Sequence, residues 1–425
     1  MKRIVDSLVS CLGRFSIVAL TLFLAVGVRA QTVFSIQGAL ASARNNNPFL
    51  KTEHFNINVA QSDIITAKLR PNPSLNNQTL QLANSKYYPS GSEWHNAVNR
   101  QVWWQLTRPF QLPSLRRSKI DFATRASNLA LQGYDETVRK FSFDVANQWL
   151  LTWIIESRLD LLQQAYTNLD SLVKINRARL RNQVITQTDL MRTQLLLEQY
   201  NLQLISAKKD FRNEIQQLKF LIGSADSIDV DIKAPIESVL LPSSVDTLYN
   251  QALSNRTDIQ TAKSNILVAE SNIRLQKAFV LPTPELGVIW NPQNTVPYVG
   301  FFGTIKLPIL DRNQGEREKS KYLQLQAVQN LQATEMQLRT EVTAAFQAYQ
   351  TEKENLKKYE NILTQSQLVL DNVKYSYLRG GTTIIDFLDA QRSWFDTRQL
   401  YLNQMLSYHQ SYIRLLFVTG LINQM

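Results

Sequence analysis

Cysteine is almost absent from this chain of 425 residues, which contains only Cys11. A disulfide needs two cysteines, so no intrachain disulfide framework holds the fold together. Histidine is scarce as well, because His54, His95 and His409 are the only three and lie in unrelated segments. The sequence also lacks a metal-ligand spacing, a nucleophile elbow and a glycine-rich phosphate loop. We therefore expect no enzymatic activity, no metal site and no cofactor.

Long apolar runs are absent beyond residues 15–28. This run follows a basic segment and ends shortly before Ala30, as in a secretory signal peptide with its small-residue cleavage site. Residues 1–30 are therefore predicted to be a signal peptide, and the mature chain is predicted to begin at Gln31. No later run approaches the roughly 20 apolar residues of a membrane-spanning helix. If the protein crosses a membrane, we expect it to do so as a β-barrel.

No compact block of one charge sign is present, although 46 lysines and arginines against 35 aspartates and glutamates give a net charge of +11. A nucleic-acid-binding surface needs clustered basic residues. The basic residues of this chain are scattered, and an exported protein rarely meets nucleic acid. We expect no nucleic acid partner.

Glycine and proline are missing from three long stretches, residues 134–222, 316–379 and 382–419. The mean helix of a globular protein has about 11–12 residues, so helices across these stretches would be exceptionally long. Their apolar residues recur at helical spacing, which is typical of helices that pack on partner helices. Four long helices are therefore predicted, over residues 112–182, 186–222, 312–379 and 383–420.

Two segments, residues 74–110 and 284–309, show the period-two alternation of β-strands. Each folds back at a polar or proline-containing middle, so each is predicted to be a β-hairpin. Strands of about ten residues with one apolar face suit tilted transmembrane strands. The aromatic residues of these hairpins suit a girdle at the membrane interface, with Trp94, Trp103, Trp104 and Trp290 as its members. The alternative is a pair of hairpins packed on a soluble core.

The order of these elements occurs twice. Residues 31–223 and 244–420 each contain a short helix, a longer helix, a β-hairpin and two long helices. Residues 224–243 are predicted to form a non-helical equatorial linker between the halves, and residues 421–425 a C-terminal tail. The ends of the two halves align at an offset of 197, with the pairs Thr186/Thr383, Asp189/Asp386, Gln194/Gln391 and Gly223/Gly420. The predicted fold class is mainly α, with a membrane β-barrel, built from a duplicated helix–hairpin–helix unit.

The number of strands constrains the assembly. Two hairpins supply four strands per chain, which cannot close a barrel in lipid, where open strand edges are not tolerated. Three chains supply twelve strands, which can close. The strand number therefore predicts a homotrimer with a shared twelve-stranded barrel.

Residues 380–391, GGTTIIDFLDAQ, combine a tight turn with the start of a helix that carries Asp-x-Leu-Asp-Ala. Together with the corner at residues 69–73 and the closing segment at 416–420, they resemble the TolC family of outer-membrane efflux channels. The resemblance covers essentially the whole mature chain. It implies a homotrimer with a twelve-stranded barrel in the outer membrane of a Gram-negative cell and a long α-helical tunnel in the periplasm. It also implies contacts with outer-membrane lipid, a periplasmic adaptor (membrane fusion) protein and an inner-membrane efflux pump.

The function implied by this resemblance is a passive exit duct of a tripartite efflux or secretion system, gated at its periplasmic tip. Asp386 and Asp389 match the aspartates that line the constricted tunnel end in the family. They are three residues apart, so they share a helix face, and a trimer would place them in two carboxylate rings that attract cations. Helix capping is the alternative for Asp386, because Thr383 precedes it by three residues, as in a capping box.

The family closes the tunnel end with a bond between a tyrosine and an aspartate of the first-half tip, and Tyr377 and Asp189 match these positions. The alternative for Tyr377 is an exposed tyrosine on an amphipathic helix. An arginine that the family carries near Thr382 is missing, which leaves the strength of this latch open. Adaptor contacts are expected at the two tips, with Val184, Thr186, Gly380, Gly381, Thr382 and Leu388 as the contact residues.

The competing interpretation is a secreted coiled-coil scaffold or interaction protein without a pore. It explains the signal peptide and the helices, but not two alternating hairpins at matching places of a duplicated unit. A periplasmic adaptor is a second alternative, but adaptors have one helical hairpin flanked by glycine-rich β domains. The sequence leaves the cargo open, whether a drug, a metal ion or another compound.

Overall fold

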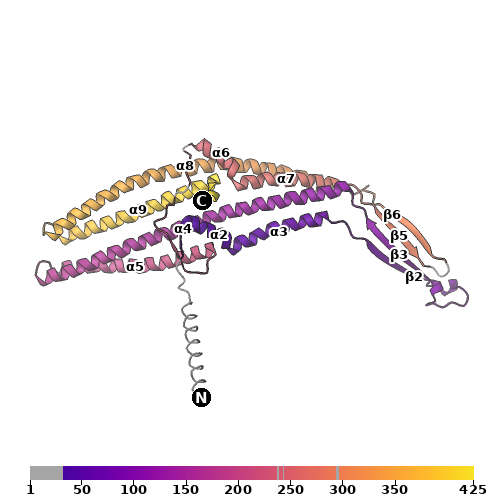
Figure 1. Ribbon diagram of the computed structural model, residues 1–425, viewed down its shortest axis with the longest axis horizontal. Helices are drawn as coiled ribbons and strands as arrows, with labels where there is room; N and C mark the ends of the chain where they lie inside the picture. The colour runs from indigo at the N-terminus through magenta and orange to yellow at the C-terminus, as the bar shows by residue number, and fades with distance from the viewer. Residues whose placement is uncertain (1–31, 237–238, 243, 293–295) are drawn as a thin grey trace, which may run out of the picture.

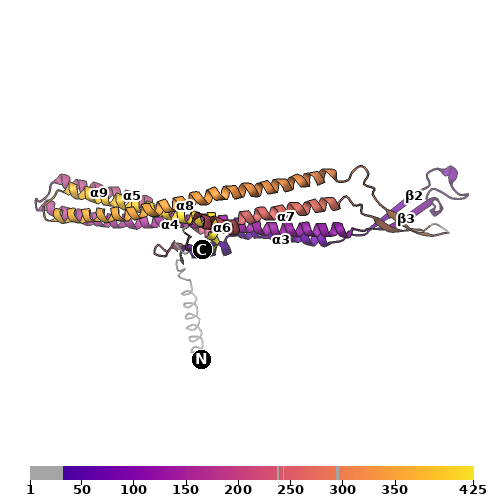
Figure 2. The same cartoon turned by 90° about the horizontal axis from the view of Figure 1, so that it is seen from above.

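The computed structural model describes residues 32–236, 239–242, 244–292 and 296–425, so the predicted signal peptide lies outside the described residues. The molecule is very elongated, with a β-sheet at one end and the turns of two helical hairpins at the other (Figure 1). The C-terminus lies near the middle of the long axis. Most of the length in between is spanned by helices that run along this axis, as the view from above also shows (Figure 2).

Four helices form the first half: α2 (Ile36–Asn46), α3 (Pro48–Lys68), α4 (Pro113–Arg181) and α5 (Gln187–Ile222). Helix α4 is 69 residues long and runs through the whole helical part. It packs against α3 on the side of the sheet and against α5 on the side of the hairpin turns. At the start of α3, Pro48 supplies a backbone that is already helical, and the Asn47 side chain accepts a hydrogen bond from the Phe49 amide.

The second half repeats this order with α6 (Val245–Asn255), α7 (Thr257–Ala278), α8 (Gln314–Leu378) and α9 (Ile384–Thr419). Helix α8 is 65 residues long and packs against α7 and α9, as α4 packs against α3 and α5. Contacts of α4 with α7 and α9 join the halves. The predicted mainly helical, duplicated fold is confirmed. Within the described residues, every helix falls short of the combined length and apolarity that crossing a membrane requires.

Both predicted β-hairpins join one antiparallel sheet of four strands, in the order β2 (Ser74–Gln81), β3 (Arg100–Pro109), β5 (Glu285–Asn291) and β6 (Tyr298–Thr304). Strand β3 pairs with β5, with Trp104 opposite Trp290, so the sheet combines one hairpin from each half. The outer edges of β2 and β6 have no strand partner in the described part of the chain. Two short 3₁₀ helices, η1 (Ser85–Tyr87) and η2 (Ala97–Asn99), lie in the connection between β2 and β3.

The equatorial linker is tied to the middle of the helices. Its strand β4 (Ile228–Val230) pairs in parallel with β1 (Thr32–Phe34). The indole of Trp149 donates to the carbonyl of Phe34 at 2.9 Å, and the Tyr412 hydroxyl donates to the carbonyl of Val239 at 3.0 Å. Beside this region the 3₁₀ helix η3 (Leu421–Gln424) ends the chain, and its Leu421 and Ile422 are buried.

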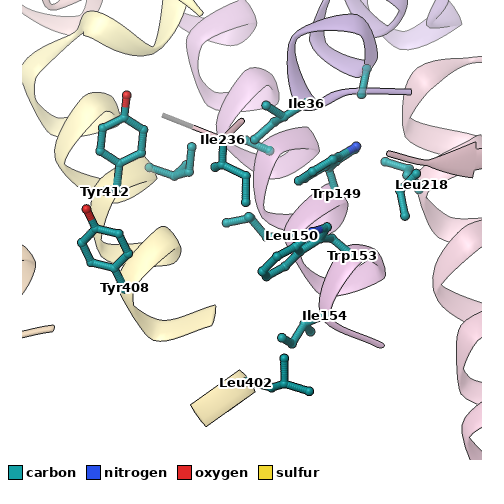
Figure 3. Packing of buried hydrophobic residues seen from close by; sticks show 14 of the residues in the cluster. Ile36, Trp149, Leu150, Trp153, Ile154, Leu218, Ile236, Leu402, Tyr408 and Tyr412 are labelled. Atoms are coloured by element: carbon teal, nitrogen blue, oxygen red, sulfur yellow. The ribbon is translucent and has the colours of Figure 1, made fainter. Parts of the chain in front are cut away.

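The core of the molecule lies at this middle. Figure 3 shows Trp149, Leu150, Trp153 and Ile154 of α4 between side chains of α2, α5, α9 and the linker. Burial of large apolar side chains from five segments provides the main stabilisation here, at about 1.5–3 kcal/mol for each fully buried side chain. From this core, α4, α5, α8 and α9 continue to the hairpin turns. In the other direction, α3, α4, α7 and α8 continue to the sheet. The core therefore fixes the two ends relative to each other.

Candidate functional site

The turns of the two helical hairpins lie side by side at the end opposite the sheet (Figure 1, Figure 2). Gln183 and Gly380 hold the left-handed position of the two turns, with φ of 59° and 78°. The amide of the next residue, Val184 or Gly381, then donates back to a carbonyl of the preceding helix at 2.9 Å or 2.8 Å. The first turn therefore has the geometry of the second without its glycine.

Both returning helices begin with a capping box. The hydroxyl of Thr186 accepts a hydrogen bond from the amide of Asp189, and the Asp189 carboxylate accepts one from the amide of Thr186. Thr383 and Asp386 make the same pair of bonds, at 3.2 Å and 3.0 Å. The carboxylates satisfy amides that the first turn of a helix leaves free and favour its positive end. Capping is therefore one role of Asp189 and Asp386.

Asp386 and Asp389 differ in what surrounds them. The Asp386 carboxylate also accepts hydrogen bonds from the hydroxyls of Thr382 and Thr383, each at 2.6 Å, and these bonds lower its pKa. Asp386 lies at the surface, and with its pKa lowered it stays ionised to more acidic pH than an ordinary aspartate. Asp389 is also exposed, and no described residue forms a hydrogen bond or ion pair with its carboxylate. Capping thus accounts for Asp386 and leaves Asp389 unexplained.

The bond between Tyr377 and Asp189 is not formed in the part of the chain that the structure describes, because both groups have other partners. Asp189 is held in its capping box, and the buried Tyr377 hydroxyl donates to Asn176 Oδ1 at 2.9 Å. Asn176 Nδ2 donates to the hydroxyl of Thr193 at 3.0 Å, and Thr193 donates to the Asp189 carbonyl at 2.9 Å. We call Tyr377, Asn176 and Thr193 the neutral latch. It joins α8 to α4 and α5, and its three residues are buried.

A cation reaches this latch from the first hairpin. The guanidinium of Arg179 lies 4.7 Å from the centre of the Tyr377 ring and donates to the carbonyls of Tyr377 and Leu378 at 3.5 Å. Phe387 stacks on Tyr377, with ring centres 5.2 Å apart. Arg179 of α4 therefore places a cation on the tyrosine at the tip.

The predicted adaptor-contact residues divide by exposure. Val184, Thr186, Gly380 and Gly381 are exposed at the turns, and Thr382 is half-buried. The prediction that Leu388 is a contact residue is wrong, because its side chain is only 6 % exposed and packs into the core between the helices. A partner protein cannot contact it without opening the hairpin. Ile385, which was not among the predicted contacts, is 52 % exposed on the same turn of α9.

The strand register places the residues of the predicted aromatic girdle on different faces of the sheet. Trp104 and Trp290 are direct cross-strand partners, so they lie on one face of the sheet. Trp103 is the neighbour of Trp104 along β3 and therefore points to the other face. A girdle member must face lipid, so Trp103 cannot belong to the same girdle as Trp104 and Trp290. Trp94 lies outside the strands, in the connection between β2 and β3, and is exposed.

The face that carries Trp104 and Trp290 is mainly apolar and exposed on β5, β6 and the middle of β3, whereas β2 adds only Leu75 beside the polar Asn77, Thr79 and Gln81. Phe301 of β6, for example, is 89 % exposed. The register places the following exposed side chains together on this face: Leu75, Trp104, Leu106, Leu286, Val288, Trp290, Val299 and Phe301. The opposite face of β2 and β3 is mainly polar, with Asn76, Gln78, Gln101, Gln105 and Thr107. A sheet with this distribution suits lipid on one side and water on the other.

The comparison with sequence families gives one match that covers most of the chain. The model of the outer membrane efflux protein family matches residues 39–224 and 248–421. The cation efflux system protein CusC of Escherichia coli K12 is 23% identical over 396 residues, which cover 87% of this chain and 82% of CusC. The pyoverdine export outer membrane protein OpmQ of Pseudomonas putida is 23% identical over 327 residues, covering 72% of this chain and 67% of OpmQ.

Solved structures share the fold over nearly the whole chain. A crystal structure of CusC superposes with a TM-score of 0.75 at 18% identity and covers 93% of this chain and 95% of CusC. The Campylobacter jejuni CmeC outer membrane channel gives a TM-score of 0.73 at 16% identity, with coverage of 91% of this chain and 85% of CmeC. With the matched residues spanning both halves, the chain belongs to the outer membrane efflux protein family.

Proposed function

We propose that this protein is the outer-membrane channel of a tripartite efflux or secretion system and that it acts as a passive exit duct. The observation that carries the proposal is the exposed apolar face of the four-stranded sheet, at one end of helices 65 and 69 residues long. In water such a face would be an association site or an aggregation hazard. In the outer membrane it is covered by lipid, and the long helices then extend into the periplasm.

Three copies of the chain form the duct. The edges of β2 and β6 lack partners within the described chain, and pairing β2 of one copy with β6 of the next would satisfy both edges. Twelve strands then close a barrel with the apolar face outward and the polar face toward the duct. The alternative of a secreted coiled-coil scaffold leaves both the apolar face and the two open edges without a role, and family membership does not support it.

The hairpin turns form the periplasmic gate. Asp386 and Asp389 of three chains would give two rings of three carboxylates, which attract cations and repel anions at the narrowest point. The neutral latch holds the α8–α9 hairpin against α4 and α5 in the closed arrangement. This latch replaces the predicted pair of Tyr377 with Asp189, and its two hydrogen bonds join uncharged side chains. Closure by this latch should therefore depend little on salt.

The exposed turns are the proposed contact with a periplasmic adaptor, which in turn connects to an inner-membrane pump. Val184, Thr186 and Gly380 are exposed at these turns, and the turns form the end of the molecule opposite the sheet (Figure 1). The cargo is not set by this chain. Its relatives are named for cation efflux, pyoverdine export and solvent efflux, at similar identity. The pump is the component that selects.

The test combines assembly with conductance. We expect the protein, extracted from the outer membrane in mild detergent, to have three times the mass of one chain and to give stepwise currents in planar bilayers. Asp389→Asn should lower the preference for cations over anions and leave the mass unchanged. Asp170→Asn, which removes a surface ion pair with Lys174, is the matched control and should change neither. A protein that stays soluble as a monomer without detergent and gives no currents would refute the proposal.

A further inference from the structure

A cavity of about 410 Å³ lies between the two helical hairpins, next to the neutral latch. All four long helices line it, with α4 and α5 on one side and α8 and α9 on the other. Aromatic side chains form much of the wall: Tyr200, Phe387, Trp394 and Phe395. Phe387 also stacks on Tyr377, so this side chain contacts both the cavity and the latch.

Three side chains of this wall end in polar atoms that have no partner among the described residues. These atoms are Tyr200 Oη, Gln391 Oε1 and Trp394 Nε1. Tyr200 is 4 % and Gln391 9 % exposed, so water does not readily replace the missing partners. Burial of unpartnered polar atoms costs free energy, and such exceptions call for a physical reason. Neighbouring side chains cover the three atoms, so contact with a ligand requires the wall side chains to rotate.

The three polar atoms define the chemistry of the ligand. The indole N–H of Trp394 needs an acceptor, the amide oxygen of Gln391 needs a donor, and the hydroxyl of Tyr200 can take either role. One hydroxyl group on the ligand can supply both a donor and an acceptor. The wall also contains Asp371 and Lys374, whose opposite charges favour no net charge on the ligand. Burial raises the pKa of Tyr200 to about 12, which keeps its hydroxyl protonated.

We propose that this cavity is a binding site for a small neutral molecule that combines a flat apolar ring with a hydroxyl group. Its volume and its aromatic wall with few polar atoms match the general form of small-molecule sites. Because both hairpins contribute to the wall, the bound molecule bridges them and stabilises the observed arrangement. The described wall of the site comes from one chain, so binding does not depend on residues of another copy.

The probe is 2-naphthol, with naphthalene as the matched compound without a hydroxyl. Uptake is measured by equilibrium dialysis of the full chain in detergent. Two variants each fill part of the cavity from opposite walls: Leu370→Trp and Ala165→Leu. The 2-naphthol that these variants still take up measures how much dissolves in the detergent micelles. We expect the unmodified protein to bind one additional 2-naphthol per chain. Equal uptake by the unmodified protein and by either folded blocked variant overturns the proposal.

Polar recognition is tested with Trp394→Phe and Tyr200→Phe, which keep a ring but remove the N–H or O–H group. Tyr200→Phe should weaken 2-naphthol binding about fivefold, the effect of one hydrogen bond, and leave naphthalene binding unchanged. Trp394→Phe also removes ring surface, so it should weaken 2-naphthol binding about fivefold more than naphthalene binding. Circular dichroism at 222 nm checks that each variant remains helical. If both probes lose the same affinity, the site is an apolar void and the hydroxyl requirement is wrong.

Discussion

Gln183 holds a left-handed backbone conformation that costs most L-residues about 1–2 kcal/mol. Its counterpart in the second turn, Gly380, adopts the same conformation without that cost. We therefore expect Gln183→Gly to stabilise the first turn by about 1 kcal/mol. The measurement is hydrogen exchange at the Val184 amide, which should become about fivefold slower, because this amide closes the turn.

The reverse change supplies the control. A Cβ atom at Gly380 has open space around it, so Gly380→Ala tests the backbone conformation alone. It should speed exchange at the Gly381 amide. Similar exchange rates in all variants would mean that the left-handed position does not limit the stability of the turns.

Two tyrosines between the same hairpins have opposite hydrogen-bonding states. Tyr377 donates to Asn176, whereas the hydroxyl of Tyr200 has no partner among the described residues. Tyr377→Phe leaves the buried Asn176 oxygen without its donor and should lower the free energy of opening by about 1–3 kcal/mol. Tyr200→Phe removes an unpartnered group and should raise that free energy. Hydrogen exchange of the peptides around the two turns measures both, and a loss of protection in Tyr200→Phe would contradict the assignment.

The tip residues show how far sequence can predict a site. The capping pairs of Thr186 and Thr383 follow from local spacing, because their partners are three residues away. The partner of Tyr377 does not, because Asn176 is 201 residues away and the bond exists only once two hairpins have packed. One signal was available: Asn176 is a polar residue on the buried face of a helix that also carries Leu169, Leu172 and Val173. A buried amide needs partners, so such a position could have been flagged.

At the scale of elements, two glycines end long helices where another helix end approaches closely. Gly223 ends α5 with φ of 67°, and a Cβ there would lie 2.8 Å from the backbone of Asn46. Gly420 ends α9 with φ of 76°, and a Cβ would lie 2.9 Å from Asn255. Both substitutions to alanine should therefore destabilise the protein by about 2 kcal/mol or more, through strain and overpacking.

Gly133 is the matched control for these two positions. It lies inside α4 with no neighbour within 4 Å of a Cβ, so Gly133→Ala should stabilise the helix by about 0.5–1 kcal/mol. Chemical denaturation measures all three variants. If Gly223→Ala and Gly420→Ala behave like Gly133→Ala, the close approach of the helix ends is not rigid.

The contact between α4 and the equatorial linker should weaken as pH rises. Burial, together with the charges of Asp229, Asp160 and Asp231, raises the pKa of Glu156 on α4 to about 7. The folded state therefore favours the protonated form more than the unfolded state does. This contribution to stability is fully present below the ordinary pKa of a glutamate, near 4.5, and is lost as pH rises through about 7.

Glu156→Gln removes this titration and keeps the shape of the side chain. We expect the variant to have a higher melting temperature than the unmodified protein at pH 8, and this difference should be smaller at pH 5. Glu354→Gln, at an exposed position of α8, is the control and should show no such pH dependence. A difference between Glu156→Gln and the unmodified protein that does not change between pH 5 and pH 8 would contradict the raised pKa.

At the scale of the whole molecule, the sequence predicts which elements form better than which surfaces they present. The absence of glycine and proline predicts the long helices, and the alternation in both hairpins predicts the strands. The pairing of β3 with β5 could not be predicted from spacing, because these strands come from different halves. It fixes the register that separates Trp103 from Trp104 and Trp290. The burial of Leu388 could likewise not be predicted, because it depends on the packing of four helices rather than on its own helix.

The proposed barrel makes a geometric prediction about the two open edges. Strand β2 runs away from the helices and β6 runs back, so β2 of one copy and β6 of the next would pair in antiparallel order. Neighbouring strands lie about 4.7–4.9 Å apart, which is within reach of a disulfide between residues on one face. With Cys11 replaced by serine, a cysteine at Asn76 can be combined in turn with one at each polar-face position of β6, such as Gly300 or Phe302.

At least one of these pairs should form a disulfide on mild oxidation and give a covalent trimer on a denaturing gel, because a closed ring of three chains has three identical seams. Asn76→Cys with Val299→Cys is the matched control, since Val299 lies on the apolar face and its side chain points away. If every polar-face pair remains monomeric, the edges do not meet and the shared barrel is wrong. If bands continue beyond the trimer, the strands pair without closing, which lipid does not tolerate. A ladder that stops at three chains is therefore the outcome that the strand number requires.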